Sequence, residues 1–181
     1  MELLEYEERH LKQLREYIGE CTVLLKKDGS FPLEKPCEIA LFGSGARRTI
    51  KGGTGSGEVN SRFFITVEEG LKERGFTVTT GKWLDEYDEV YRNARRSFIK
   101  DVRANARKNK ENAVVASMGT VMPEPEFQLP LEGKGEAAVY VLSRISGEGS
   151  DRKFVKGDFL LTDSEVRDIM ELNKKHERFM G

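Results

Sequence analysis

The stretch from Ala40 to Arg62 reads ALFGSGARRTIKGGTGSGEVNSR, and it decides the fold. An apolar run ending at Phe42 opens into six glycines within fifteen residues: Gly43, Gly45, Gly52, Gly53, Gly55 and Gly57. A second stretch of the same design, AAVYVLSRISGEGSDR, follows at 137–152. Parallel strands bring the loops that follow them to one edge of a sheet, where open α/β sheets bind ligands. The two stretches therefore predict one shared site.

Composition limits the class of protein. The 181 residues are 38% hydrophobic and 34% charged, with thirty Lys and Arg against thirty-one Asp and Glu, so no overall charge favours nucleic acid or membrane as a partner. The N-terminus is acidic and amphipathic, and no apolar run reaches membrane-spanning length, which predicts a cytoplasmic protein without a secretory signal. Cys21 and Cys37 are too few for a disulfide framework or a metal site. We expect neither a metal nor a cofactor.

Apolar periodicity predicts the elements of the first half of the chain. Helices are expected over 3–20 and after a cap at Asn60 or Ser61, the second with a buried face of Phe63, Phe64, Val67 and Leu71 and an end at Gly75. Strands are expected over 38–42 and 76–80, with a shorter β-type run over 21–25. Strand 38–42, the glycine loop, the helix and strand 76–80 form a βαβ unit, which is built on a parallel sheet.

The second half continues the same architecture. A long helix is expected from Trp83 to about Lys110, and its acidic start and basic end suit the helix dipole. That favours a solvated structural helix. The alternative, a basic stripe that binds nucleic acid, is not supported by an aromatic platform interleaved with the basic residues. An irregular loop over 117–135 precedes a strand over 137–142. A last helix follows, with Thr162 and Glu165 as its capping box and with Val166, Ile169 and Met170 expected in its buried face.

These elements predict an α/β fold, a three-layer α/β/α sandwich with a mostly parallel, incomplete sheet. Three or four strands are few for such a sheet, so the chain looks truncated relative to its own architecture. We expect a single, partial sandwich domain over 1–181, with an N-terminal helix and linker segment over 1–36. An uncovered strand edge invites pairing, which predicts a homodimer.

Two loops carry the candidate chemistry. The glycine loop is no P-loop, because Glu58 follows Gly57 where that motif needs Lys, and it is no clean dinucleotide fingerprint. Its bare N–H groups and Ser56 suit an anion or a sugar hydroxyl, with a flexible solvent loop as the alternative. In the second loop, Glu148 lies between two glycines, which suits a general acid or base. A solvated side chain is the alternative there.

Taken together, three segments resemble glycoside hydrolase family 3, the β-glucosidases and their relatives. They are ECTVLLKKDGSFPL at 20–33, KGGTGSGEVNSR at 51–62 and SRISGEGSDRKFVKGDF at 143–159. The resemblance is to the α/β-sandwich domain that accompanies the family's (β/α)8 barrel. It covers the chain apart from the basic helix.

The resemblance implies a retaining β-glycosidase that acts on terminal β-glucosides. Such enzymes use two carboxylates about 5–5.5 Å apart. Glu148 would be the acid/base, and Ser56, with Gly53, Thr54 and Gly55, would contact the sugar. The nucleophilic Asp and a Lys-His pair would lie on the barrel, which these 181 residues do not contain. The isolated chain is therefore expected to be inactive.

Two other readings of the chain stay open. One is a non-catalytic carbohydrate-binding or regulatory module, and within the family a naturally short relative that has lost catalysis is the alternative to a piece of a longer enzyme. The other is a nucleotide- or nucleic-acid-binding α/β domain that uses the glycine loop and the basic helix. The main reading expects a β-glucoside or short β-linked oligosaccharide and the barrel as partners, with no nucleic acid and no membrane.

Overall fold

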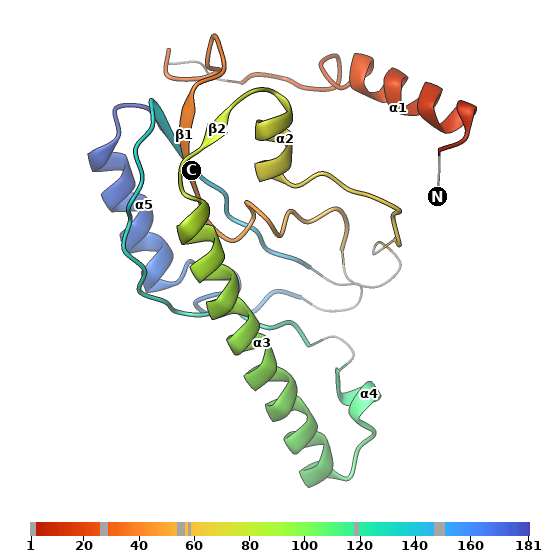
Figure 1. The fold of residues 1–181 in the computed structure, drawn as a ribbon. Helices are drawn as coiled ribbons and strands as arrows, with labels where there is room; N and C mark the ends of the chain where they lie inside the picture. The colour runs from red at the N-terminus through yellow and green to blue at the C-terminus, as the bar shows by residue number, and fades with distance from the viewer. Residues whose placement is uncertain (1–2, 26–28, 54–56, 58, 118–119, 147–150) are drawn as a thin grey trace. The chain divides into compact units, whose positions relative to one another are not determined.

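A computed structural model gives the structure of the protein (Figure 1). It describes residues 3–25, 29–53, 57, 59–117, 120–146 and 151–181. The chain divides into two compact units, 1–33 and 34–181. In the first unit, helix α1 spans Glu5–Tyr17 and has no buried residue. The predicted N-terminal helix is confirmed, whereas the β-type run over 21–25 is wrong, because those residues pair with no strand.

The second unit is organised around a parallel sheet. The strands that the structure describes are β1 (Glu38–Phe42), β2 (Thr77–Val78), β3 (Ala137–Tyr140) and β4 (Phe179–Met180), in the order β2-β1-β3-β4. Every pairing is parallel, and β1 faces β3 along four residues, from Ile39 opposite Ala137 to Phe42 opposite Tyr140. With helices flanking this sheet, the predicted α/β sandwich is confirmed (Figure 1). The sequence pattern did not predict β4, which follows directly after the last helix.

The core lies where β1 and β3 meet helix α3 (Gly81–Asn109). All residues of β1 after Glu38 are buried, as their continuous apolar run predicts for a central parallel strand. Trp83 and Tyr87, from the first turns of α3, stack with ring centroids 5.3 Å apart. Phe42 contacts Trp83 edge-on at 5.2 Å, and Phe127 contacts Tyr87 edge-on at 5.1 Å. This aromatic cluster fixes the start of α3 against the end of β1.

Helix α2 (Val67–Glu73) begins later than the sequence pattern suggested. Thr66 is its N-cap: the Thr66 hydroxyl accepts from the Glu69 N–H at 3.1 Å, and the Glu69 carboxylate accepts from the Thr66 N–H at 2.8 Å. A cap at Asn60 or Ser61 is therefore wrong, since neither has a Glu or Gln three residues later to complete a capping box. Phe63 and Phe64 are exposed rather than buried.

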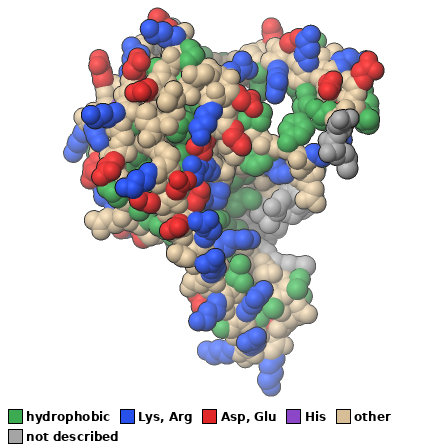
Figure 2. All heavy atoms as spheres, in the orientation of Figure 1, with side chains coloured by type: hydrophobic (Ala, Val, Ile, Leu, Met, Phe, Trp, Pro, Cys, Tyr) green, Lys and Arg blue, Asp and Glu red, His purple; other side chains and the backbone are tan. Residues whose placement is uncertain are grey.

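Helix α3 differs between its two halves. Its first turns are buried in the core, whereas its second half carries most of its basic side chains and contacts helix α4 (Ala113–Ser117), which the sequence did not predict. Figure 2 shows Lys and Arg gathered over this second half. No described helix is long and apolar enough to cross a bilayer.

Helix α5 (Asp163–Lys175) begins at the predicted capping box of Thr162 and Glu165 but turns another face inward. Glu165 is 1% exposed and Asp168 0%, while Val166 and Met170 are 46% and 53% exposed. The apolar face predicted to be buried is therefore wrong at these two positions. The reason is electrostatic: arginine side chains form ion pairs with Glu165 and Asp168, which offset part of the cost of burying the two carboxylates.

Candidate functional site

The stems of the two loops meet at one edge of the sheet. The Gly45 N–H donates to the Val141 carbonyl at 2.8 Å, and the Ser143 N–H donates to the Ser44 hydroxyl at 3.3 Å. The Ser143 hydroxyl donates to the Arg48 carbonyl at 3.1 Å. The parallel pairing of β1 and β3 thus places the two loops side by side, as the sequence predicted for such strands.

The loops also approach each other farther from the sheet. A Cβ atom at Gly53 would lie 2.8 Å from the Ser146 carbonyl oxygen, so the two backbones are in contact there. Of the predicted site residues, Gly53 is the one that the structure places. Thr54, Gly55, Ser56 and Glu148 lie outside the described residues, and their roles stay predictions.

An ion-pair network holds the root of the glycine loop, by which we mean the segment after β1 that contains Arg47 and Arg48. Arg47 donates to Glu68 at 2.6 Å, to Asp85 at 2.6 Å and to Asp88 at 3.1 Å, which ties the loop to α2 and α3. The hydrogen bond to Glu68 is the main reason why the pKa of Arg47 is raised. Burial opposes ionisation of Glu68, but hydrogen bonds from Arg47 and Lys72 lower its pKa overall. Arg47 and Glu68 are therefore both charged at neutral pH.

Arg48 extends this root toward the second loop. Its guanidinium donates to Asp88 at 2.8 Å and stacks over the ring of Tyr91, 3.8 Å from the centroid. A planar cation on an aromatic face is a favourable arrangement that also fixes the side chain's direction. One nitrogen of the same group, Nη2, is buried without a hydrogen-bond partner among the described residues.

A second ion-pair network holds the root of the loop that contains Glu148, by which we mean Arg144 before that residue and Arg152 and Asp158 after it. Asp158 accepts from two arginines: its carbonyl from Arg144 at 3.0 Å and its carboxylate from Arg152 at 2.9 Å. Arg144 also donates to Glu165 at 2.5 Å. Since the same Glu165 oxygen accepts the Thr162 N–H at 2.9 Å, the loop is joined directly to the start of α5.

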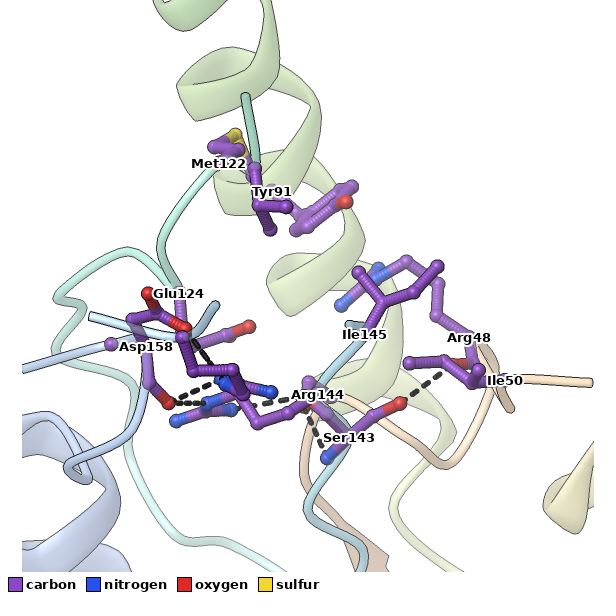
Figure 3. Close-up of a pocket in the computed structure, with 13 residues that line it drawn as sticks. Arg48, Ile50, Tyr91, Met122, Glu124, Ser143, Arg144, Ile145 and Asp158 are labelled. Carbon is purple, nitrogen blue, oxygen red and sulfur yellow. Dashed lines mark hydrogen bonds and ion pairs between the residues drawn. The ribbon is translucent and has the colours of Figure 1, made fainter. Parts of the chain in front are cut away.

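A cavity of about 160 Å³ lies between the two roots (Figure 3). Burial, reinforced by the charge of Glu165, raises the pKa of Glu124 from 4.5 to about 7. Glu124 Oε1, like Arg48 Nη2, is buried without a hydrogen-bond partner among the described residues. The cavity therefore combines a cation with a carboxyl group that is partly protonated at neutral pH. Its lining includes Ser44, Ile50, Tyr91, Met122, Ser143 and Ile145.

The described residues contain no group of three or more His, Cys, Asp or Glu side chains placed to hold a metal ion. The chemistry available at this edge is that of carboxyl, hydroxyl and guanidinium groups. Such groups bind polar ligands by hydrogen bonds and transfer protons.

Sequence reasoning missed the residues that build the roots, which are Arg47, Arg48, Glu124, Arg144 and Asp158. Two signals were present in the sequence. Adjacent arginines follow Gly45 directly, and Arg144 and Arg152 lie four residues before and four residues after Glu148. No local signal points to Glu124, because its environment is created by distant segments.

Comparison with known proteins agrees with this architecture. The model of the glycosyl hydrolase family 3 C-terminal domain matches residues 22–177. Beta-glucosidase A of Butyrivibrio fibrisolvens is 28% identical over 169 residues, which are 93% of this chain and 19% of that protein. Beta-glucosidase 3B of Thermotoga neapolitana, solved in complex with α-D-glucose, is similar with 36% identity and a TM-score of 0.59, over 93% of this chain and 22% of that one. Its complex with glycerol gives 32% identity and a TM-score of 0.62 over the same shares.

The fold and the paired loops define an α/β-sandwich domain with a polar site at the carboxyl edge of its sheet. The chain belongs to glycosyl hydrolase family 3, as its C-terminal domain. It spans about a fifth of the length of the relatives named above.

Proposed function

We propose that this domain completes the active site of a retaining β-glucosidase that hydrolyses terminal β-glucosides. In this proposal Glu148 is the acid/base and Ser56 contacts the bound sugar. A (β/α)8 barrel of the same enzyme supplies the nucleophilic carboxylate. The observation that carries the proposal is the contact of Gly53 with Ser146, because it brings the backbones that lead to Ser56 and Glu148 together at the sheet edge.

The chemistry has two steps. Glu148 first donates a proton to the glycosidic oxygen while the barrel's carboxylate attacks the anomeric carbon, which releases the aglycone and leaves a glycosyl-enzyme. Glu148 then removes a proton from water, which attacks the same carbon and releases the sugar with its original configuration. Two carboxylates are needed, so the isolated domain should not turn over.

The test uses the longer enzyme that joins this domain to a barrel, assayed on aryl β-glucosides. Glu148→Ala should reduce kcat/KM about 10²- to 10⁴-fold on glucosides with poor leaving groups. The variant should lose much less kcat/KM on a dinitrophenyl glucoside, because that leaving group departs without protonation. Azide should restore turnover, with formation of a glycosyl azide. Asp151→Ala, which removes the next carboxylate along the chain, is the matched control and should keep near-normal rates.

Two results would count against the proposal. One is a reading frame that stops at Gly181 with no barrel encoded, which would favour a binding module. The other is Glu148→Ala with normal hydrolysis and no response to azide. Ser56→Ala, expected to weaken kcat/KM without any azide response, separates sugar contact from proton transfer.

A further inference from the structure

Arg144 and Arg152, which flank Glu148 symmetrically in the sequence, both bind the same residue. We propose that Asp158 is a positioning residue for the acid/base, fixing the two flanks of Glu148 relative to each other. This inference rests on the proposed function, because it concerns how the protein directs Glu148. It assigns Asp158 no contact with the substrate.

The contacts form a clamp, defined here as Arg144, Arg152 and Asp158. The Asp158 carbonyl accepts from Arg144 Nε at 3.0 Å and from Arg152 Nη2 at 2.5 Å. The Asp158 carboxylate accepts from Arg152 Nε at 2.9 Å and from the Lys153 N–H at 2.8 Å. One residue thus binds both sides of the loop, through its backbone and its side chain.

The clamp is shielded from water. The side chains of Arg144, Arg152 and Asp158 are 18%, 24% and 15% exposed. Hydrogen bonds between charged groups are about twice as strong as neutral ones, and partial burial reduces their screening by salt. The three side chains therefore hold a defined arrangement, of which Figure 3 labels Arg144 and Asp158.

The clamp also stands on fixed structure. Arg144 is joined to the buried Glu165 at the start of α5. On the other side, the Gly157 carbonyl accepts the Glu124 N–H at 2.7 Å, and the Gly157 N–H donates to the Leu160 carbonyl at 2.8 Å. Asp158 is therefore held at a constant place from which it orients the flanks.

The two flanks depend on Asp158 in different ways. Arg144 binds its carbonyl, which every substitution keeps, and has Glu165 as a second partner. In the flank after Glu148, Arg152 Nε and the Lys153 N–H bind its carboxylate, and Arg152 Nη2 also binds its carbonyl. Removing the carboxylate should therefore loosen the flank after Glu148, which keeps one of three contacts, and leave the flank before it in place.

The first test uses the 181-residue chain and the NMR signals of the arginine Nε–H groups. Asp158→Ala should shift and broaden the Arg152 signal, while the Arg144 signal keeps its position. The control is Asp163→Ala, which removes a 75% exposed carboxylate paired with Lys156. It should change neither signal. An Arg152 signal that is unchanged in Asp158→Ala would overturn the clamp.

The second test uses the longer enzyme. Asp158→Ala should lower kcat/KM about 10- to 100-fold on glucosides with poor leaving groups and little on a dinitrophenyl glucoside, because a displaced acid/base loses that order of rate. Asp158→Asn keeps an acceptor oxygen and should lie between wild type and Asp158→Ala. It also serves as the readout if Asp158→Ala does not fold. An equal loss on both substrates would show a general structural role and overturn the proposal.

A double variant separates this inference from the proposed function. If Asp158 acts through Glu148, Asp158→Ala should have almost no further effect in a Glu148→Ala background. A persisting 10-fold loss there would overturn the positioning role while leaving Glu148 as acid/base. Normal activity of Glu148→Ala alone would refute the proposed function, and the positioning role with it.

Discussion

The roots of the two loops are both held by arginine–carboxylate networks, yet the networks lie in different surroundings. Arg47, at the glycine loop, binds three carboxylates, one of which, Asp85, is 73% exposed. Arg144, at the loop that contains Glu148, binds Glu165, which is 1% exposed. The first network contains several carboxylates, one of them exposed, whereas Arg144 has a single, buried carboxylate partner among the described residues.

This difference matters because burial decides how much an ion pair's loss costs. An exposed pair contributes about 0–1 kcal/mol. Breaking a buried pair by removing one partner costs about 3–5 kcal/mol, since the remaining charge stays buried without compensation. The root of the loop that contains Glu148 should therefore be the more fragile of the two, and four measurements test that.

The largest expected effect is that of Glu165→Ala. It should reduce the free energy of unfolding by about 3–5 kcal/mol, because it leaves Arg144 without its buried carboxylate and opens the capping box of α5. Denaturant unfolding measures the loss. Glu69→Ala opens the corresponding capping box of α2 at the solvent surface. It should reduce the free energy of unfolding clearly less. Equal losses would show that the ion pair with Arg144 adds no stability beyond that of the capping box.

The next effect depends on pH. Burial raises the pKa of Glu124 to about 7 from 4.5, so the native protein binds more protons than the unfolded chain between these values. Stability from this group is present below about pH 4.5 and is lost as pH rises through 7, by up to about 3 kcal/mol. Glu124→Gln should remove this dependence. Parallel stability curves of both proteins from pH 5 to 8 would contradict it.

A smaller loss is expected for Gly157→Ala. Gly157 has a φ of +79°, and an added Cβ would lie 2.4 Å from the Glu124 carbonyl oxygen. The strained conformation alone costs about 1–3 kcal/mol. Gly81, at the first turn of α3, has open space around its Cβ position, so Gly81→Ala is the control and should be neutral or stabilising. Thermal unfolding compares the two; similar melting temperatures would contradict the close contact.

The smallest effect belongs to the glycine-loop root. Asp85→Asn should cost less than about 1 kcal/mol, since its side chain is exposed and Arg47 keeps Glu68 and Asp88 as partners. The loss should shrink further in high salt. Unfolding at low and high salt measures it. A large, salt-independent cost would mean that this root is as dependent on one pair as the other.

Much of the fold followed from local patterns. The apolar run of β1 gave its bounds, and the Thr162–Glu165 spacing gave the start of α5. The paired loops after β1 and β3 were expected at one edge and lie there. Predictions were wrong where several local signals competed: the run over 21–25 pairs with none of the described strands, and Thr66 caps α2 in place of Asn60 or Ser61.

The sequence by itself determined the strands β1, β2 and β3, the cap of α5, the family and the order of the two loops, because each depends on residues close together in the chain. Only the tertiary structure decided which charges pair. Arg47 meets Asp85 across 38 positions and Arg144 meets Glu165 across 21, and no periodic pattern records such distances. The same pairing explains why α5 turns Glu165 inward and leaves Met170 exposed. A buried charge follows its partner, and the partner's place is set by the whole fold.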